Sequence, residues 1–299
     1  MSLPEQLTQA NLRFWHSTRL AFKIFLQIDG EQWAGAFAYN AFFSLFPLMI
    51  LLVTFTSLFI ERDVAVSKVI AFMDTYVPSS GQWQQNIAGT ITSVINSRTE
   101  AGLLAFVMLI FATLRGFTTL ISATNRAWGI ESYNFWRLPL RSLILLGVTM
   151  GSILFGLIVP VLLRGLRNLI SPSNESLFLL FEVGNYFVPL VSMFVGLSLF
   201  YKLSPKRPTQ FSEVWVGALS ATLLLVGSES LFVVYLSSFS KLNAVYGAMG
   251  GIMALLLWIY LSGCFFIFGA CICSSKAEFK SFNLKELAGD HIQPVDHLA

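Results

Sequence analysis

An uncharged run of 25 residues, Ala36 to Ile60, constrains this chain more than any other feature. About 20 apolar residues are enough for a helix to cross the hydrocarbon core of a bilayer. Only 12% of all residues are charged, against roughly a quarter in a soluble domain. Further apolar runs of similar length follow at 101–122, 138–163, 177–201, 211–236 and 245–273. The sequence therefore predicts an all-α, polytopic membrane protein with about six transmembrane helices.

The basic residues predict the orientation, because Lys and Arg are retained on the cytoplasmic side of a membrane. With the N-terminus inside, twelve of them fall in inner segments and six in outer loops, while Arg115 lies within a span. We therefore expect both termini in the cytoplasm. The chain would form a single membrane domain over residues 1–275, followed by a polar cytoplasmic tail over 276–299.

Two segments outside the spans also carry a pattern. Residues Asn11–Ile28 place their basic side chains on one arc of a helix and most of their large apolar side chains on the other. This predicts either an N-terminal helix lying in the membrane interface or a helix packed on the cytoplasmic ends of the bundle. The loop from Glu61 to Glu100 contains the turn signal Pro78-Ser79-Ser80-Gly81, which predicts an outer helical hairpin.

A polar stripe on the second span is the sharpest candidate site. It recurs at helical spacing and consists of Arg115, Thr118, Thr119, Ser122, Asn125 and Arg126. A charged residue in the middle of a bilayer costs about 3 kcal/mol on insertion scales, so Arg115 should face protein or water. Asn40 and Ser44 share a face of the first span. These two residues and the first five residues of the stripe are candidates for a cavity or substrate path open to the cytoplasm. The alternative is that the hydroxyl and amide groups only hold helices together.

Two carboxylates, Glu182 and Glu229, lie at similar depth near the outer ends of their spans. They are candidates for an outer vestibule; the alternatives are that they share a proton or pair with basic residues near the outer surface. Small residues recur four positions apart at Gly147 and Gly151 in the third span. A similar pattern in the last span comprises Gly247, Gly251 and Ala254. Both patterns predict close helix packing.

Three stretches together resemble the YihY/virulence factor BrkB family of bacterial inner-membrane proteins, formerly called ribonuclease BN. They are AGAFAYNAFFSLFPLMILL with Tyr39, Ser44 and Pro47; LRGFTTLISATNRAWGI with Arg115, Gly116 and Asn125; and YGAMGGIMALLLWIYLSGCFFIFGA with Tyr246, Trp258 and Gly269. The resemblance implies a six-helix protein of the bacterial inner membrane whose biochemical activity is not settled. The family often has Glu after Gly-Ala in the last helix, where this chain has Cys271, so a role of that glutamate does not transfer.

The leading functional hypothesis is movement of a lipid, another amphiphile or a small polar solute through a polar cavity open to the cytoplasm. The alternative is a non-transporting membrane scaffold for envelope integrity. A ribonuclease is disfavoured, because the three histidines, His16, His291 and His297, have no carboxylate cluster near them. We expect no enzymatic activity, no cofactor, no metal site and no nucleic-acid partner. The expected partners are the lipid bilayer and a lipid or anionic solute.

Overall fold

The computed structural model describes residues 17–56, 98–130, 138–169, 175–239 and 243–287. These residues form helices and short connections, with no β-strand among them. Besides a helix over residues 17–27, the helices are α2 (Gly30–Thr56), α5 (Arg98–Ala127), α6 (Leu138–Leu169), α7 (Glu175–Leu203), α8 (Phe211–Phe239) and α9 (Asn243–Leu287). The all-α prediction is confirmed. Most of the predicted outer hairpin lies outside the described residues.

Five of these helices are long and apolar enough to cross a membrane, and Phe187–Leu203 of α7 is a shorter apolar segment. Between 17% and 39% of the most apolar stretch of each long helix is buried by protein, so lipid must cover most of the remainder. The long spans are Gly30–Phe55, Gly102–Ala127, Ser142–Gly165, Phe211–Tyr235 and Gly250–Glu278. The chain is therefore a multi-pass membrane protein, as the apolar runs predict.

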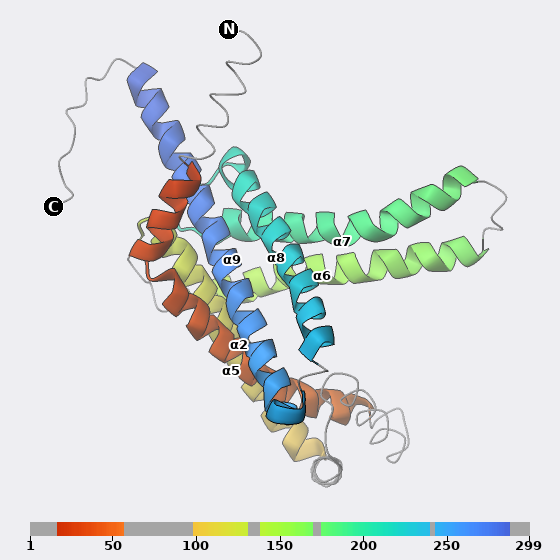
Figure 1. Ribbon diagram of the computed structural model, residues 1–299. Helices are drawn as coiled ribbons and strands as arrows, with labels where there is room; N and C mark the ends of the chain where they lie inside the picture. The colour runs from red at the N-terminus through yellow and green to blue at the C-terminus, as the bar shows by residue number, and fades with distance from the viewer. Residues whose placement is uncertain (1–16, 57–97, 131–137, 170–174, 240–242, 288–299) are drawn as a thin grey trace.

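The helices form two arms that meet at one end (Figure 1). Helices α2, α5, α8 and α9 form one arm, in which α2 packs on α5 and α9, and α8 packs on α9. Helices α6 and α7 form a hairpin that points away from this four-helix group (Figure 1). The hairpin contacts the group through α5 and α8. We call the end where the arms meet the closed end. It contains the helix over 17–27, the C-terminal ends of α5 and α7, and the start of α8.

The closed end is fastened by a close crossing of α8 and α9. A methyl group on Gly269 would lie 2.5 Å from the Tyr201 hydroxyl and 3.0 Å from the Gly217 carbonyl oxygen, so only glycine fits this position. The Tyr201 side chain of α7 is fully buried, and its hydroxyl donates a hydrogen bond of 2.7 Å to the Phe266 carbonyl. Three helices are thus held together at one level by backbone contact and one side-chain bond.

The hairpin is held by small residues four positions apart on each helix. Ser152 and Gly156 of α6 face Ser192 and Gly196 of α7, and the Ser192 hydroxyl donates to the Ser152 carbonyl. The predicted packing of Gly147 and Gly151 is wrong for the described helices, because a Cβ atom at either position would have no described atom within 4 Å. The physical reason is the direction of the helix face: Ser152 follows Gly151 by one residue, about 100° round the helix, and that direction meets α7.

The helix over residues 17–27 packs on α9 at the closed end. Ala21 is fully buried, and the Phe25 ring lies 6.2 Å from the Phe268 ring of α9. On the opposite side Phe22 and Leu26 are exposed beside the exposed Lys23. Of the two predicted arrangements, the structure therefore places this helix on the bundle, with an amphipathic outer face.

The last helix is longer than predicted, since α9 runs to Leu287 and includes the first part of the predicted tail. Ala277 is buried, and the Ser275 hydroxyl donates a bond of 3.0 Å to the Ser17 carbonyl. These contacts explain why the helix continues past the apolar run. Cys271 and Cys273 are buried, and the three cysteines are free thiols.

Candidate functional site

The polar stripe of α5 passes through two different environments. Ser122 and Asn125 are buried near the closed end, whereas Arg115 is exposed. Between them Thr118 shares a hydrogen bond of 3.0 Å with Ser142 of α6, which marks the point where these two helices touch. Thr119 is half-buried, and its hydroxyl donates to the Arg115 carbonyl of its own helix. The stripe is therefore covered at one end and uncovered at the other.

Asn125 has a structural environment. Its side-chain nitrogen donates to the Ile121 carbonyl at 2.8 Å and to the Ser204 carbonyl at 3.3 Å, and its oxygen accepts a bond of 3.0 Å from the Lys206 backbone N–H. These bonds tie the end of α5 to the connection between α7 and α8. Gly129, with φ of 68°, then ends the helix.

Arg115 lies one turn further along α5 from the contact with α6. Seven residues separate it from the buried Ser122, so the two share a helix face. The Arg115 guanidinium stacks on the Phe111 ring at 5.2 Å, and no carboxylate contacts it among the described residues. Because Arg115 points in the same direction as the buried Ser122, its exposure means that no described helix covers this turn of α5.

Helix α8 shows the same change along one face. Ala218 and Thr222 are fully buried, and Glu229 follows them by eleven and seven residues, which places it on the same face. Glu229 is nevertheless exposed. The side chain of Glu182, its predicted vestibule partner, lies outside what the structure describes.

Asn40 and Ser44 both bond to their own helix. The Asn40 side-chain nitrogen donates to the Ala36 carbonyl at 2.7 Å, and the Ser44 hydroxyl donates to the Ala41 carbonyl at 2.6 Å. Asn40 also lies against α5, because a methyl group on Gly116 would come within 3.8 Å of its Cβ. The structure therefore brings Asn40 to the residue next to Arg115.

A cleft of about 580 Å³ lies at the closed end and was missed by sequence reasoning. Four separate segments line it: the helix over 17–27, the end of α5, the start of α8 with the preceding connection, and α9. Its charged and polar side chains include Gln27, Arg126, Arg207, Gln210, Glu213, Ser274 and Glu278. In the sequence, Arg126 and Arg207 contribute to the predicted orientation, and Arg126 also ends the polar stripe of the second span.

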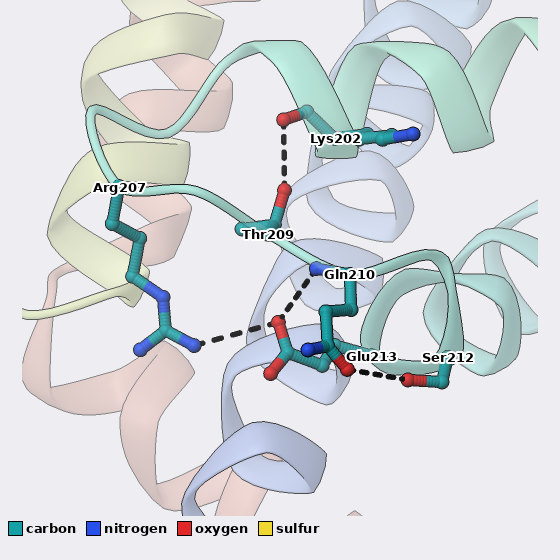
Figure 2. Close-up of polar contacts among 6 residues, drawn as sticks. All are labelled: Lys202, Arg207, Thr209, Gln210, Ser212 and Glu213. Carbon is teal, nitrogen blue, oxygen red and sulfur yellow. Dashed lines mark hydrogen bonds and ion pairs between the residues drawn. The ribbon is translucent and has the colours of Figure 1, made fainter.

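The cleft wall at the start of α8 is built around Glu213 (Figure 2). The Glu213 carboxylate accepts a bond of 3.1 Å from the Gln210 backbone N–H, which caps the first turn of α8. It also pairs with Arg207 at 3.5 Å. The Thr209 hydroxyl donates to the Lys202 carbonyl at 2.8 Å, which fixes the connection from α7 (Figure 2).

Cations at the closed end are stacked on tryptophans. Arg207 lies 4.3 Å from the Trp128 ring, and Arg126 lies 5.2 Å from the Trp33 ring. A guanidinium over an aromatic ring is attracted to the face of that ring. Among the described residues, no group of three His, Cys, Asp or Glu side chains could hold a metal ion.

Comparison with known proteins places the chain in a family. YfkH of Bacillus subtilis, whose name calls it ribonuclease-like, is 27% identical over 81% of this chain and 88% of its own length. A UPF0761 membrane protein of Idiomarina loihiensis is 29% identical over 70% of this chain and 72% of its own length. A UPF0761 membrane protein of Photobacterium profundum is 27% identical over 88% of this chain and 81% of its own length. No solved structure matches the chain.

The family model described as virulence factor BrkB matches residues 21–283. This range covers every helix discussed above except the first residues of the helix over 17–27 and the last residues of α9. The resemblance seen in the sequence is thereby confirmed, and the chain belongs to the virulence factor BrkB family.

Proposed function

We propose that this protein moves an amphiphile with an anionic group across the bacterial inner membrane. The polar part of the amphiphile would pass between the α6–α7 hairpin and the four-helix group. One observation carries the proposal. The face of α5 that contains Ser122 and the face of α8 that contains Thr222 are buried at the closed end, and no described residue covers them further out. Each face has a charged residue where the cover is lost, Arg115 on α5 and Glu229 on α8.

The surroundings of Arg115 favour an amphiphile over a small solute. Phe111, Met108 and Leu104 continue the same face of α5, and all three are exposed. A cation beside an apolar strip offers one surface to an anionic head and another to acyl chains. Since a charge is costly at membrane depth, a headgroup or water beside Arg115 would lower that cost.

The predicted topology suggests the route by which the amphiphile reaches Arg115. With both termini in the cytoplasm, the closed end faces the cytoplasm and the arms diverge toward the outer leaflet. The amphiphile would then reach Arg115 from the side, between α5 and α6, without entering a pore.

A vesicle assay tests the proposal. Purified protein is reconstituted into vesicles that contain a fluorescent phospholipid. A reductant is added outside, and the rate at which the label of the inner leaflet becomes accessible to it is measured. Wild-type protein should accelerate this movement. Arg115→Ala should slow it by roughly tenfold, the loss expected for one hydrogen bond to a charged group. Lys202→Ala removes an exposed cation at the end of α7 and should leave the rate unchanged.

A scaffold function is favoured by one observation, the use of Asn125 as a structural link between α5 and the start of α8. If all polar residues of the stripe were such links, Arg115→Ala protein would move lipid no more slowly than wild type. That outcome would reject movement along α5 and favour the scaffold.

A further inference from the structure

The cleft at the closed end contains an ion pair that is only half engaged. Arg207 contacts Glu213 through one nitrogen and one oxygen, 3.5 Å apart. A guanidinium carries five N–H donors, and the other donors of Arg207 have no partner among the described residues. The side chain is 43% exposed, so this edge can be reached from the cleft.

The Glu213 carboxylate likewise has one oxygen that is not engaged in the pair. The oxygen that pairs with Arg207 also accepts the Gln210 N–H bond, whereas the second carboxylate oxygen has no partner in the described part of the chain. The side chain is 12% exposed. This oxygen is not among the buried unpaired atoms of the described residues, so it can accept a hydrogen bond from a ligand in the cleft.

Trp128 adds an unused donor to the same wall. It lines the cleft beneath Arg207 and is 9% exposed. Its indole N–H is buried and finds no hydrogen-bond partner within the described residues. Buried polar groups are hydrogen-bonded in the great majority of cases, so an unused one marks a place where a ligand or water is expected.

The charges of the cleft are balanced, with Arg126 and Arg207 against Glu213 and Glu278. A simple anion would meet both carboxylates, and a simple cation would meet both guanidiniums. A ligand that carries both charges a short distance apart would complete the bonding of each member of the half-engaged pair. A phosphate matches the planar fork of arginine, and an ammonium group matches a single carboxylate oxygen.

We propose that this cleft binds a zwitterionic phosphoamine, a phosphate ester linked to an ammonium group, as in ethanolamine phospholipids. The phosphate oxygens accept from Arg207, and the ammonium group donates to the open oxygen of Glu213. This inference rests on the proposed function in that it names the polar part of the amphiphile. The cleft is then the site where the headgroup is held at the closed end, before the arms diverge.

The test is binding to the purified full-length protein in detergent, measured by native mass spectrometry. Phosphatidylethanolamine and phosphatidylglycerol are titrated separately, since both carry a phosphate and only the first carries an ammonium group. Wild type should prefer phosphatidylethanolamine. Glu213→Gln keeps the cap on α8, because Gln also serves at this position, and should weaken phosphatidylethanolamine about tenfold without weakening phosphatidylglycerol.

The matched cation variants complete the test. Arg207→Gln should weaken both lipids about tenfold, since it removes the phosphate partner. Lys202→Gln, which changes a nearby exposed cation outside the cleft, should weaken neither. Melting temperatures measured alongside show that each variant is folded. Equal binding of both lipids by wild type, or an equal loss of both lipids in Glu213→Gln, would overturn the assignment.

A third titration identifies the source of the ligand. Soluble glycerophosphoethanolamine that displaces the lipid at similar concentration would assign the site to a free phosphoamine. Displacement by the lipid alone would assign it to the membrane, and both results support the ligand class. Binding is measured without transport, so bound headgroup without lipid movement leaves this inference standing and rejects the proposed function. Lipid movement without preferential binding of phosphatidylethanolamine leaves the proposed function standing and rejects this inference.

Discussion

The closed end and the diverging arms use the same residue types in opposite ways. At the closed end the polar stripe of α5 is buried and bonded across segments, as Asn125 is to Ser204 and Lys206. Further out the charged side chains of Arg115 and Glu229 share faces with buried residues yet are exposed. The comparison teaches that a polar stripe on a membrane helix has no single function, because its meaning depends on what covers each turn.

The largest effect should come from breaking the crossing that fastens the closed end. Gly269→Ala would place a methyl group 2.5 Å from the Tyr201 hydroxyl and 2.7 Å from the Ala221 Cβ. Overpacking typically costs about 1 to 3 kcal/mol, and backbone contact on the third side limits relaxation here. We expect a large loss of folded protein and a lower melting temperature in detergent. Gly151→Ala is the control, since its methyl group meets open space. Equal loss in both variants would contradict the account.

Breaking the Asn125 link should have the next largest effect. Asn125→Leu keeps the number and branching of the heavy atoms but leaves the Lys206 N–H and the Ser204 carbonyl without this partner. Each buried group left unsatisfied costs about 1 to 3 kcal/mol. The melting temperature should therefore fall clearly. Thr119→Val, at a half-buried position bonded to its own helix, should melt near wild type. An unchanged melting temperature in Asn125→Leu would show that the link is not structural.

A smaller effect is expected inside the hairpin. Ser192→Ala removes the hydroxyl that bonds the Ser152 carbonyl and keeps the close approach of α6 and α7. Hydrogen bonds between membrane helices average about 0.6 kcal/mol in mutant cycles. The melting temperature should drop only slightly. A loss as large as that of Gly269→Ala would mean that the hairpin depends on this bond more than on packing.

The smallest change in stability is expected at the exposed charges. Arg115→Ala, Glu229→Ala and the double variant should all melt close to wild type, because neither residue has an ion-pair partner among the described residues. A buried pair behaves differently, since removing one partner typically costs about 3 to 5 kcal/mol. Large losses in both single variants that the double variant restores would reveal such a pair. These losses would also show that polar residues of the diverging arms are bonded as they are at the closed end.

The sequence was sufficient to predict the helices and insufficient to predict their arrangement. Apolar runs are a local property of the chain, so the helices could be located to within a few residues at most of their described ends. Which face meets a neighbour is decided by the partner helix. Gly147 and Gly151 have the same spacing as Ser152 and Gly156, yet only the second pair lies against α7.

The candidate site shows the same limit. Periodicity correctly placed Arg115 and Ser122 on one face, but it could not show that the cover of this face ends between them. The closed-end cleft was missed because its lining comes from four segments far apart in the chain. Arg126 and Arg207 were visible as basic residues, and only the folded chain brings each of them onto a tryptophan.

The central claim is that the space between the arms beside α5 and α8 is polar and reached by water, which solvent exposure alone cannot distinguish from a lipid-facing surface. The direct measurement is the reaction of single cysteines with a charged, water-soluble thiol reagent, in protein whose three cysteines are replaced by alanine. Phe106→Cys and Thr222→Cys serve as controls, because Phe106 is exposed on the opposite side of α5 from Arg115 and Thr222 is buried. The account predicts rapid reaction of Arg115→Cys and Glu229→Cys and slow reaction of both controls. Reaction of Arg115→Cys and Glu229→Cys as slow as that of Phe106→Cys would place both charges against lipid and contradict it.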